Sequence, residues 1–184
     1  MYVDGSYHWP SQRMFYAAVV YDHRGRVRLR RLGSESGGDS AEAEALAALL
    51  GICSIRELHN GRPPAGWKLL SDHRGLIQAI RGQRDITGRL RPYVAEARLL
   101  LAGGEPVWVS RERNFSAHWT ADQRHLAREG VVCELPVDDQ PPRQAAHAQR
   151  LADARRRLRF ADSKTRVKAA GALAPLTSPA VAAG

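Results

Sequence analysis

Several acidic residues of this chain have types and spacing that suit a divalent-metal site. Asp4 follows Tyr2 and Val3, which favour a strand, and precedes Gly5, which allows a turn or the close approach of another backbone. Asp72 follows a second apolar run, residues 67–71. Because an isolated Asp-Gly pair usually marks a turn, Asp4 gains a chemical role only if other carboxylates lie beside it in the fold.

The elements that must position these carboxylates follow from hydrophobic periodicity and turn residues. Besides the strand that Asp4 ends or interrupts, we predict strands at residues 15–21, 26–32, 67–71 and 106–110. We predict helices from 39 or 40 to about 58, between Asp72 and Gly82, at 89–101 and at 115–128. The order β-β-β-α-β-α-α-β-α predicts an α/β fold, a five-stranded mixed sheet with helices on both faces.

This order gathers acidic residues at one end of the predicted sheet. Asp72 ends a strand, and Glu42 or Glu44 lies in the first turns of the first long helix. Sites in open α/β sheets form outside the carboxyl ends of strands, where three carboxylates would repel one another without a cation. Oxygen ligands suit Mg²⁺ or Mn²⁺, and two such ions about 4 Å apart support in-line phosphodiester hydrolysis.

Length and composition indicate a single soluble domain. The chain has 184 residues, of which 43% are hydrophobic, and this suffices for one core. Its two cysteines exclude a disulfide framework and a cysteine zinc site, and we predict that Cys53 is a small core residue. No apolar run reaches the roughly 20 residues of a membrane span and no signal peptide is evident. We therefore expect a cytoplasmic monomer with no membrane partner.

A basic extension follows this domain. Of the formal net charge of +9, residues 141–184 carry +7, from nine basic against two acidic residues. We predict a domain at 1–135 and an extension at 136–184 that is helical at about 145–160 and otherwise disordered. Such a tail favours a polyanion such as nucleic acid, with a solvated tail as the alternative. Its candidate contacts are Arg155, Arg156 and Arg157.

Four motifs in this order resemble type 1 ribonuclease H. They are Asp4-Gly5-Ser6, the helix start at residues 41–47, Leu70-Ser71-Asp72, and the sequence Asn-Phe-Ser-Ala-His at residues 114–118. The resemblance covers residues 1 to about 130 and implies a ribonuclease H-like fold. It also implies an endonuclease that hydrolyses the RNA strand of RNA–DNA hybrids with two Mg²⁺ (or Mn²⁺) ions. Asp4, one helix glutamate and Asp72 would then be catalytic metal ligands.

Two positions of this implied site stay open. Glu42 matches the Ala-Glu pattern of the family, whereas Glu44 leaves Glu42 free to cap the helix and places small residues where the helix approaches the sheet; we favour Glu44. Where the family often has Asn-x-x-Ala-Asp, this chain has His118. Either His118 or Asp122, one turn further on, would complete the site. Alternatively, His118 lies on the helix surface and Asp122 pairs with an arginine.

Further residues are candidate nucleic-acid contacts. Ser6 and Asn114 belong to the resembling motifs, and the loop with Arg111 and Arg113 lacks the histidine that many relatives use near product release. Either arginine is a candidate phosphate contact, with a simply exposed side chain as the alternative. Three rival functions remain, because fold does not fix function. The first is a non-catalytic nucleic-acid-binding module on the same fold, and the second is a same-fold nuclease with a DNA substrate. The third is a protein-interaction domain whose acidic residues have no catalytic role.

Overall fold

A computed structural model describes residues 1–137 of the chain. Its strands are β1 (Tyr2–His8), β2 (Arg13–Tyr21), β3 (Val27–Ser36), β4 (Lys68–Ser71), β5 (Glu105–Trp108) and β6 (Cys133–Glu134). Its α-helices are α1 (Ser40–Leu58), α2 (Arg74–Ile80), α3 (Leu90–Leu100) and α4 (Phe115–Ala121). Three short 3₁₀ helices are η1 (Trp9–Ser11), η2 (Arg111–Asn114) and η3 (Arg124–Leu126).

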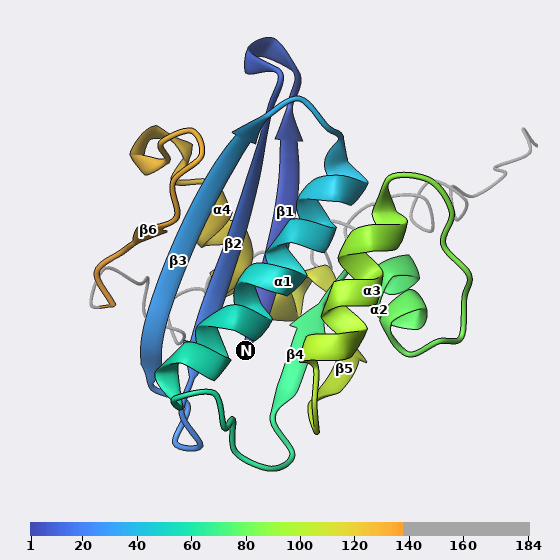
Figure 1. The fold of residues 1–184 in the computed structure, drawn as a ribbon. Helices are drawn as coiled ribbons and strands as arrows, with labels where there is room; N and C mark the ends of the chain where they lie inside the picture. The colour runs from blue at the N-terminus through green and yellow to red at the C-terminus, as the bar shows by residue number, and fades with distance from the viewer. Residues whose placement is uncertain (138–184) are drawn as a thin grey trace, which may run out of the picture. The chain divides into compact units, whose positions relative to one another are not determined.

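The strands form one mixed sheet in the order β5-β4-β1-β2-β3-β6 (Figure 1). The strands β1, β2 and β3 form an antiparallel meander, whereas β4 pairs parallel to β1 and to β5. This confirms the predicted α/β class and mixed sheet. The predicted count of five strands was wrong by one, because β6 pairs with β3 through Arg31 and Leu32 only. Two residues are too few to give a periodic signal.

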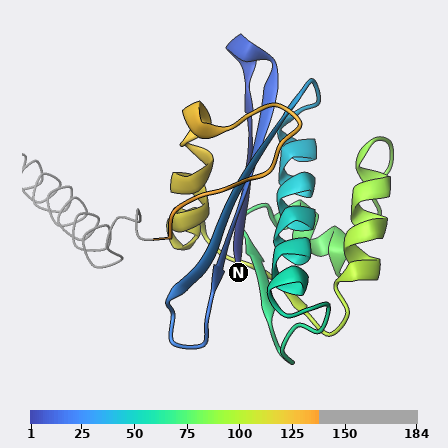
Figure 2. The ribbon, with the colours of Figure 1, turned by 60° about the vertical axis from the view of Figure 1, so that its left-hand side comes forward.

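Helices cover both faces of the sheet, as predicted (Figure 2). The helices α1, α2 and α3 share one core cluster with the sheet, and α4 packs on the opposite face against Ala17 and Leu32. Val3 of β1 points to the α1 face, where it contacts Gly51. Side chains alternate along a strand, so Asp4 points to the α4 face.

Asp4 lies inside β1 and not at its end, which corrects the expectation of a strand that stops there. The β1–β2 ladder continues from Tyr2 opposite Val19 to His8 opposite Arg13. The glycine that suggested a turn serves a close approach instead. A Cβ on Gly5 would lie 2.2 Å from the backbone carbon of Ala43 and from the backbone nitrogen of Glu44. Gly5 therefore allows α1 to lie directly on β1.

The first long helix begins where the sequence predicts. Asp39 is its N-cap, and its carboxylate accepts hydrogen bonds from the backbone N–H groups of Ala41 and Glu42. These bonds satisfy two of the free donors at the start of a helix. They also fix the register of α1, and hence which side of the helix carries each glutamate. In contrast, Cys53 is exposed and is not the core residue expected from the sequence.

The helix α4 is shorter than predicted, because it ends at Ala121 instead of running to residue 128. After it, η3 places the Arg124 guanidinium 5.5 Å from the centre of the Phe15 ring on β2. The N–H of Gly130 then donates to the carbonyl oxygen of Ser34. These contacts with the sheet turn the chain away from the helix axis and lead it into β6.

The predicted basic helix at 145–160 lies outside the described residues, as do Arg155, Arg156 and Arg157. The domain boundary at 135/136 and the disorder of the extension stay predictions. Within residues 1–137, no helix is both long enough and apolar enough to cross a membrane.

We predict that Gly5→Ala lowers the free energy of unfolding by about 2–3 kcal/mol, because α1 must move away from β1 to admit the methyl group. Urea denaturation measures this change. Gly37→Ala is the control, because a Cβ there meets open space and adds only the strain of a positive φ, about 1 kcal/mol. Equal losses in the two variants would contradict the close approach at Gly5.

Candidate metal centre

Three side chains converge on the α4 face of the sheet. Asp4 comes from β1, Asp72 follows β4 and His118 comes from α4. The imidazole of His118 bridges the two carboxylates, with 2.8 Å from Nδ1 to Asp4 Oδ1 and 3.1 Å from Nε2 to Asp72 Oδ2. One ligand atom from each residue lies within 4.8 Å of the other two, which is close enough for one metal ion to contact all three.

The parallel pairing of β1 with β4 brings the two aspartates together. Tyr2 pairs with Leu70, so Asp72 leaves the end of β4 beside Asp4. Asn114, fully buried at the start of α4, donates from Nδ2 to the carbonyl oxygen of Val3 and to Asp72 Oδ1, both at 2.8 Å. One side chain therefore ties the helix, the central strand and the Asp72 carboxylate together.

This burial corrects the expectation that Asn114 contacts nucleic acid. Its amide group faces the interior, and its role in the structure is to position Asp72. A second positioning contact comes from Trp108 on β5, whose Nε1 donates to the backbone oxygen of Asp72 at 3.1 Å. No motif pointed to Trp108, because the contact depends on the pairing of β4 with β5.

Burial and charge set the pKa values of the three groups. Burial disfavours the charged form of His118, but hydrogen bonds to Asp4 and Asp72 outweigh it and raise the pKa of His118 to about 9. Burial raises the pKa of Asp4 despite the opposing effect of His118. Burial also opposes ionisation of Asp72, yet the hydrogen bonds from His118 and Asn114 prevail and lower its pKa. Without a metal, the imidazolium of His118 offsets one of the two carboxylate charges.

Of the two candidate glutamates, Glu44 faces this cluster. Burial first, and then the charges of Asp4 and Asp72, raise the pKa of Glu44 well above its usual value. Its carboxylate accepts a hydrogen bond from the backbone N–H of Gly5, and its buried Oε2 has no hydrogen-bond partner among residues 1–137. The open oxygen of a buried carboxylate beside two further carboxylates favours a cation.

Glu42 is also buried, but it points elsewhere. Its Oε1 lies 3.5 Å from the Tyr93 hydroxyl group of α3. Two residues along an α-helix correspond to a rotation of about 200°, so Glu42 and Glu44 leave α1 on nearly opposite sides. Glu42 is therefore a buried residue that is not part of the Asp4 cluster.

The remaining candidate residues are Asp122, Arg111, Arg113 and Ser6. Asp122 is not part of it, because this residue caps the end of α4 with its side chain 74% exposed and 3.9 Å from Arg124. Arg111 is exposed in η2, and its charge lowers the pKa of Asp4, which places it near the site. Arg113 is exposed in the same short helix. Ser6 lies two residues beyond Asp4 on the same face of β1.

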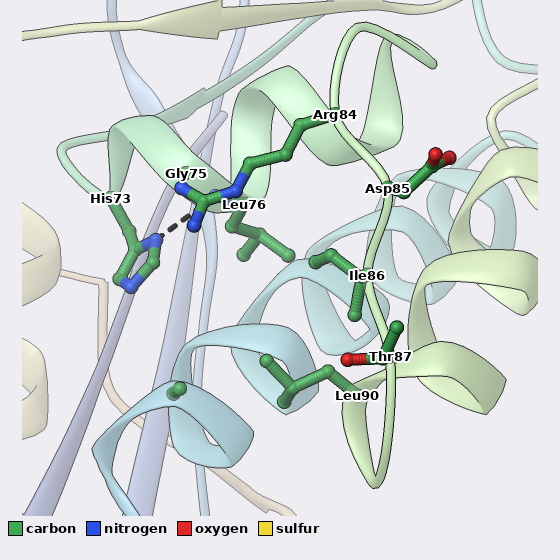
Figure 3. Close-up of a pocket in the computed structure, with 9 residues that line it drawn as sticks. His73, Gly75, Leu76, Arg84, Asp85, Ile86, Thr87 and Leu90 are labelled. Atoms are coloured by element: carbon green, nitrogen blue, oxygen red, sulfur yellow. Dashed lines mark hydrogen bonds between the residues drawn. The ribbon is translucent and has the colours of Figure 1, made fainter.

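A cavity of about 310 Å³ is lined by His73, the residue that follows Asp72 in the sequence, but not by Asp72 itself. Figure 3 shows His73, the residue after Asp72, at one side and Arg84 above it. The Nδ1 atom of His73 accepts from the backbone N–H of Leu76 at 3.0 Å, which caps α2. The carboxylates of the cluster are not in its wall, so this cavity is distinct from the candidate metal centre.

Known structures share the fold of this chain. The N-terminal ribonuclease H domain of a Mycobacterium tuberculosis protein, solved as a fusion with maltose-binding protein, has a TM-score of 0.59 and 20% identity over 66% of this chain and 94% of that chain. Ribonuclease H1 of the archaeon Halobacterium salinarum has a TM-score of 0.58 and 19% identity over 66% and 92%. The chain has a ribonuclease H-like fold.

A third ribonuclease H-like structure is LC11 ribonuclease H1 in complex with an RNA/DNA hybrid, with a TM-score of 0.61 and 13% identity over 66% of this chain and 92% of that chain. No protein-family model and no curated protein matches the sequence. At these identities the similarity shows the ribonuclease H-like fold.

We predict that the His118 bridge makes the stability of the metal-free protein depend on pH. The pKa of His118 is raised from 6.5 to about 9 in the folded state, so its stabilising effect is complete below pH 6.5 and is lost as the pH rises through about 9. In EDTA, the stability advantage of the wild type over His118→Asn should shrink steadily between pH 6.5 and pH 9, as urea denaturation at each pH would measure. A difference that stays constant over this range would contradict an imidazolium bridge.

Proposed function

We propose that this protein is a metal-dependent endonuclease that hydrolyses the RNA strand of RNA–DNA hybrids by a two-metal-ion mechanism. The observation that carries the proposal is the convergence of Asp4, Asp72 and His118, with Glu44 near enough for their charges to act on it, on a ribonuclease H-like fold. The similar LC11 enzyme was solved with an RNA/DNA hybrid bound, and this supports the choice of substrate class.

The residues present fit a divalent cation. Asp4 and Glu44 are buried, and the negative charge of neighbouring carboxylates raises the pKa of both in addition to the effect of burial. The unpartnered Oε2 of Glu44 is an available donor atom. Carboxylate oxygens suit Mg²⁺ and Mn²⁺, whereas an imidazole nitrogen suits later transition metals better. The mixed donor set with His118 therefore fits Mn²⁺ better than Mg²⁺.

The chain's own groups would divide the work of hydrolysis. Asp4, Asp72 and His118 would hold metal, and Glu44 would hold a second ion or orient the attacking water. Bound divalent ions would supply positive charge at the scissile phosphate and activate that water. Asn114 fixes the Asp72 carboxylate for this task. Arg111 is exposed and near enough to Asp4 to lower its pKa, and it would contact the phosphate backbone.

A second candidate function is a nucleic-acid-binding module without catalysis. The observation that favours it is the bridge itself, because an imidazolium between Asp4 and Asp72 offsets part of the negative charge of the site without a metal. This reading expects salt-sensitive hybrid binding and no cleavage in Mg²⁺ or Mn²⁺. A nuclease with a DNA substrate would instead cleave duplex DNA in the same assay.

We predict that Asp72→Asn lowers the rate of hybrid cleavage by at least about 100-fold, because it removes a charged ligand at the reacting phosphate. Cleavage of a labelled RNA–DNA hybrid in Mn²⁺, beside RNA and DNA duplexes, measures this loss. Asp122→Asn is the matched control, because the exposed Asp122 lies outside the cluster, and it should keep nearly the wild-type rate. Cleavage that survives Asp72→Asn would refute the metal assignment.

The His118 ligand also predicts a metal preference. With saturating metal, cleavage in Mn²⁺ should exceed cleavage in Mg²⁺ by roughly tenfold, which corresponds to about 1.4 kcal/mol. His118→Asp replaces the nitrogen donor by oxygen and should bring the two rates closer together. If His118→Asp leaves the ratio of the two rates unchanged, His118 does not touch the metal.

A further inference from the structure

The face of the sheet that carries Asp4 continues toward the β1–β2 hairpin. Ser6 follows Asp4 on this face and lies directly opposite Phe15 of β2. Arg13 is the next residue on the same face of β2. Directly opposed residues of an antiparallel pair project on one side of the sheet, and side chains alternate along each strand. The candidate metal centre and these three side chains therefore share one surface.

Two guanidinium groups lie over the Phe15 ring. Arg13 lies 5.4 Å from the ring centre, and Arg124 of η3 lies 5.5 Å from it. The ring is buried, with 3% of its surface exposed, and a cation over an aromatic face is attracted to it. The Phe15 ring therefore contacts two guanidinium groups of like charge.

Polar atoms of this group are buried without a partner in the described part of the chain. They are Arg13 Nε, Arg13 Nη2, Arg124 Nε and Ser6 Oγ. Leaving a buried donor unsatisfied costs about 1–3 kcal/mol, and more for a charged group. The two nitrogens of Arg13 form one edge of the guanidinium, and such an edge binds the two oxygens of a phosphate or carboxylate as a fork.

The neighbouring carboxylates Asp122 and Glu129 do not satisfy these unpartnered donors. Asp122 lies 3.9 Å from Arg124 Nη2 and leaves Arg124 Nε free of a hydrogen bond. Glu129 accepts a hydrogen bond from the hydroxyl group of Ser36. The Arg124 side chain is 34% exposed, so the group borders the surface, and its buried donor atoms must turn outward to receive an anion.

We propose that Arg13, Arg124 and Ser6 form a subsite for one phosphate of the strand that is cut. This inference rests on the proposed function. Two residues along β1 span about 7 Å. The subsite, at the level of Ser6, therefore lies about 7 Å along the strand from Asp4. Phosphates of one duplex strand are spaced about 3.4 Å along the helix axis. The bound phosphate is therefore one or two nucleotides away from the scissile phosphate.

The short separation also selects the strand. An RNA–DNA hybrid has a wide, shallow minor groove when it takes an A-like form, so phosphates of the opposite strand lie farther from the scissile position. The subsite would hold the cut strand in register over the metal centre. It supplies charge and a fork of donors without reading the base sequence.

The first test is binding of a short RNA–DNA hybrid in EDTA, measured by fluorescence anisotropy over a range of salt concentrations. The double variant R13Q/R124Q should bind at least about tenfold more weakly, and its slope of log affinity against log salt should fall by about 1. Arg28→Gln removes the same charge from an exposed position of β3 and should change both quantities much less.

The second test is cleavage of hybrids that carry one uncharged methylphosphonate linkage at a known position. In the wild type, a linkage in the RNA strand should suppress the cut one or two nucleotides away, and the same linkage in the DNA strand should not. In R13Q/R124Q this position-specific suppression should disappear. If the two arginines had only a structural role, their substitution would not change which linkages suppress cleavage. If the double variant does not fold, both tests use the single variants R13Q and R124Q, because each of them keeps one guanidinium over Phe15.

The outcomes separate this inference from the proposed function. A wild type that binds hybrid but does not cleave it, together with weaker binding and a smaller salt slope in the variants, supports the subsite and overturns the nuclease. A wild type that cleaves, with affinity, salt slope and interference pattern unchanged in the variants, overturns the subsite and leaves the nuclease. A wild type that does not bind hybrid at all overturns the subsite.

Discussion

Buried negative charge is the constraint on which the site depends. Asp4 and Glu44 are both nearly excluded from solvent, and Asp72 lies beside them. Carboxylates in such an environment either take up protons or gather a cation. Here His118 supplies that cation by bridging Asp4 and Asp72. A metal ion at the same place would do the same electrostatic work with more charge, so proton and metal compete for one position.

Local signals predicted most of the fold, because they act within a few residues. The Asp39 cap and the apolar periodicity of α1 are of this kind, and both are as predicted. The elements that sequence reasoning missed are defined by distant partners. The early end of α4 follows from the contact of Arg124 with Phe15, and β6 exists only as a partner of β3. Neither contact leaves a periodic pattern in its own segment.

The same distinction between local signals and long-range contacts holds for the candidate site. Asp4 and Asp72 could be found from sequence, because each adjoins an apolar strand. The sequence alone could favour Glu44 over Glu42 but could not decide between them. The choice depends on which side of α1 meets β1 at Gly5. The role of Asn114 escaped prediction because its hydrogen bond to Val3 joins residues 111 positions apart. Contacts between segments that are far apart in the sequence assign these roles.

The most direct measurement is a crystal structure of the protein with Mn²⁺, with the ion located by its anomalous scattering. The proposal predicts Mn²⁺ bound to carboxylate oxygens of Asp4 and Asp72 at about 2.0–2.3 Å, with a ring nitrogen of His118 turned to the ion and the hydrogen-bonded bridge lost. Crystals saturated with Mn²⁺ at neutral pH that show no ion there, and His118 still between the two aspartates, would contradict it.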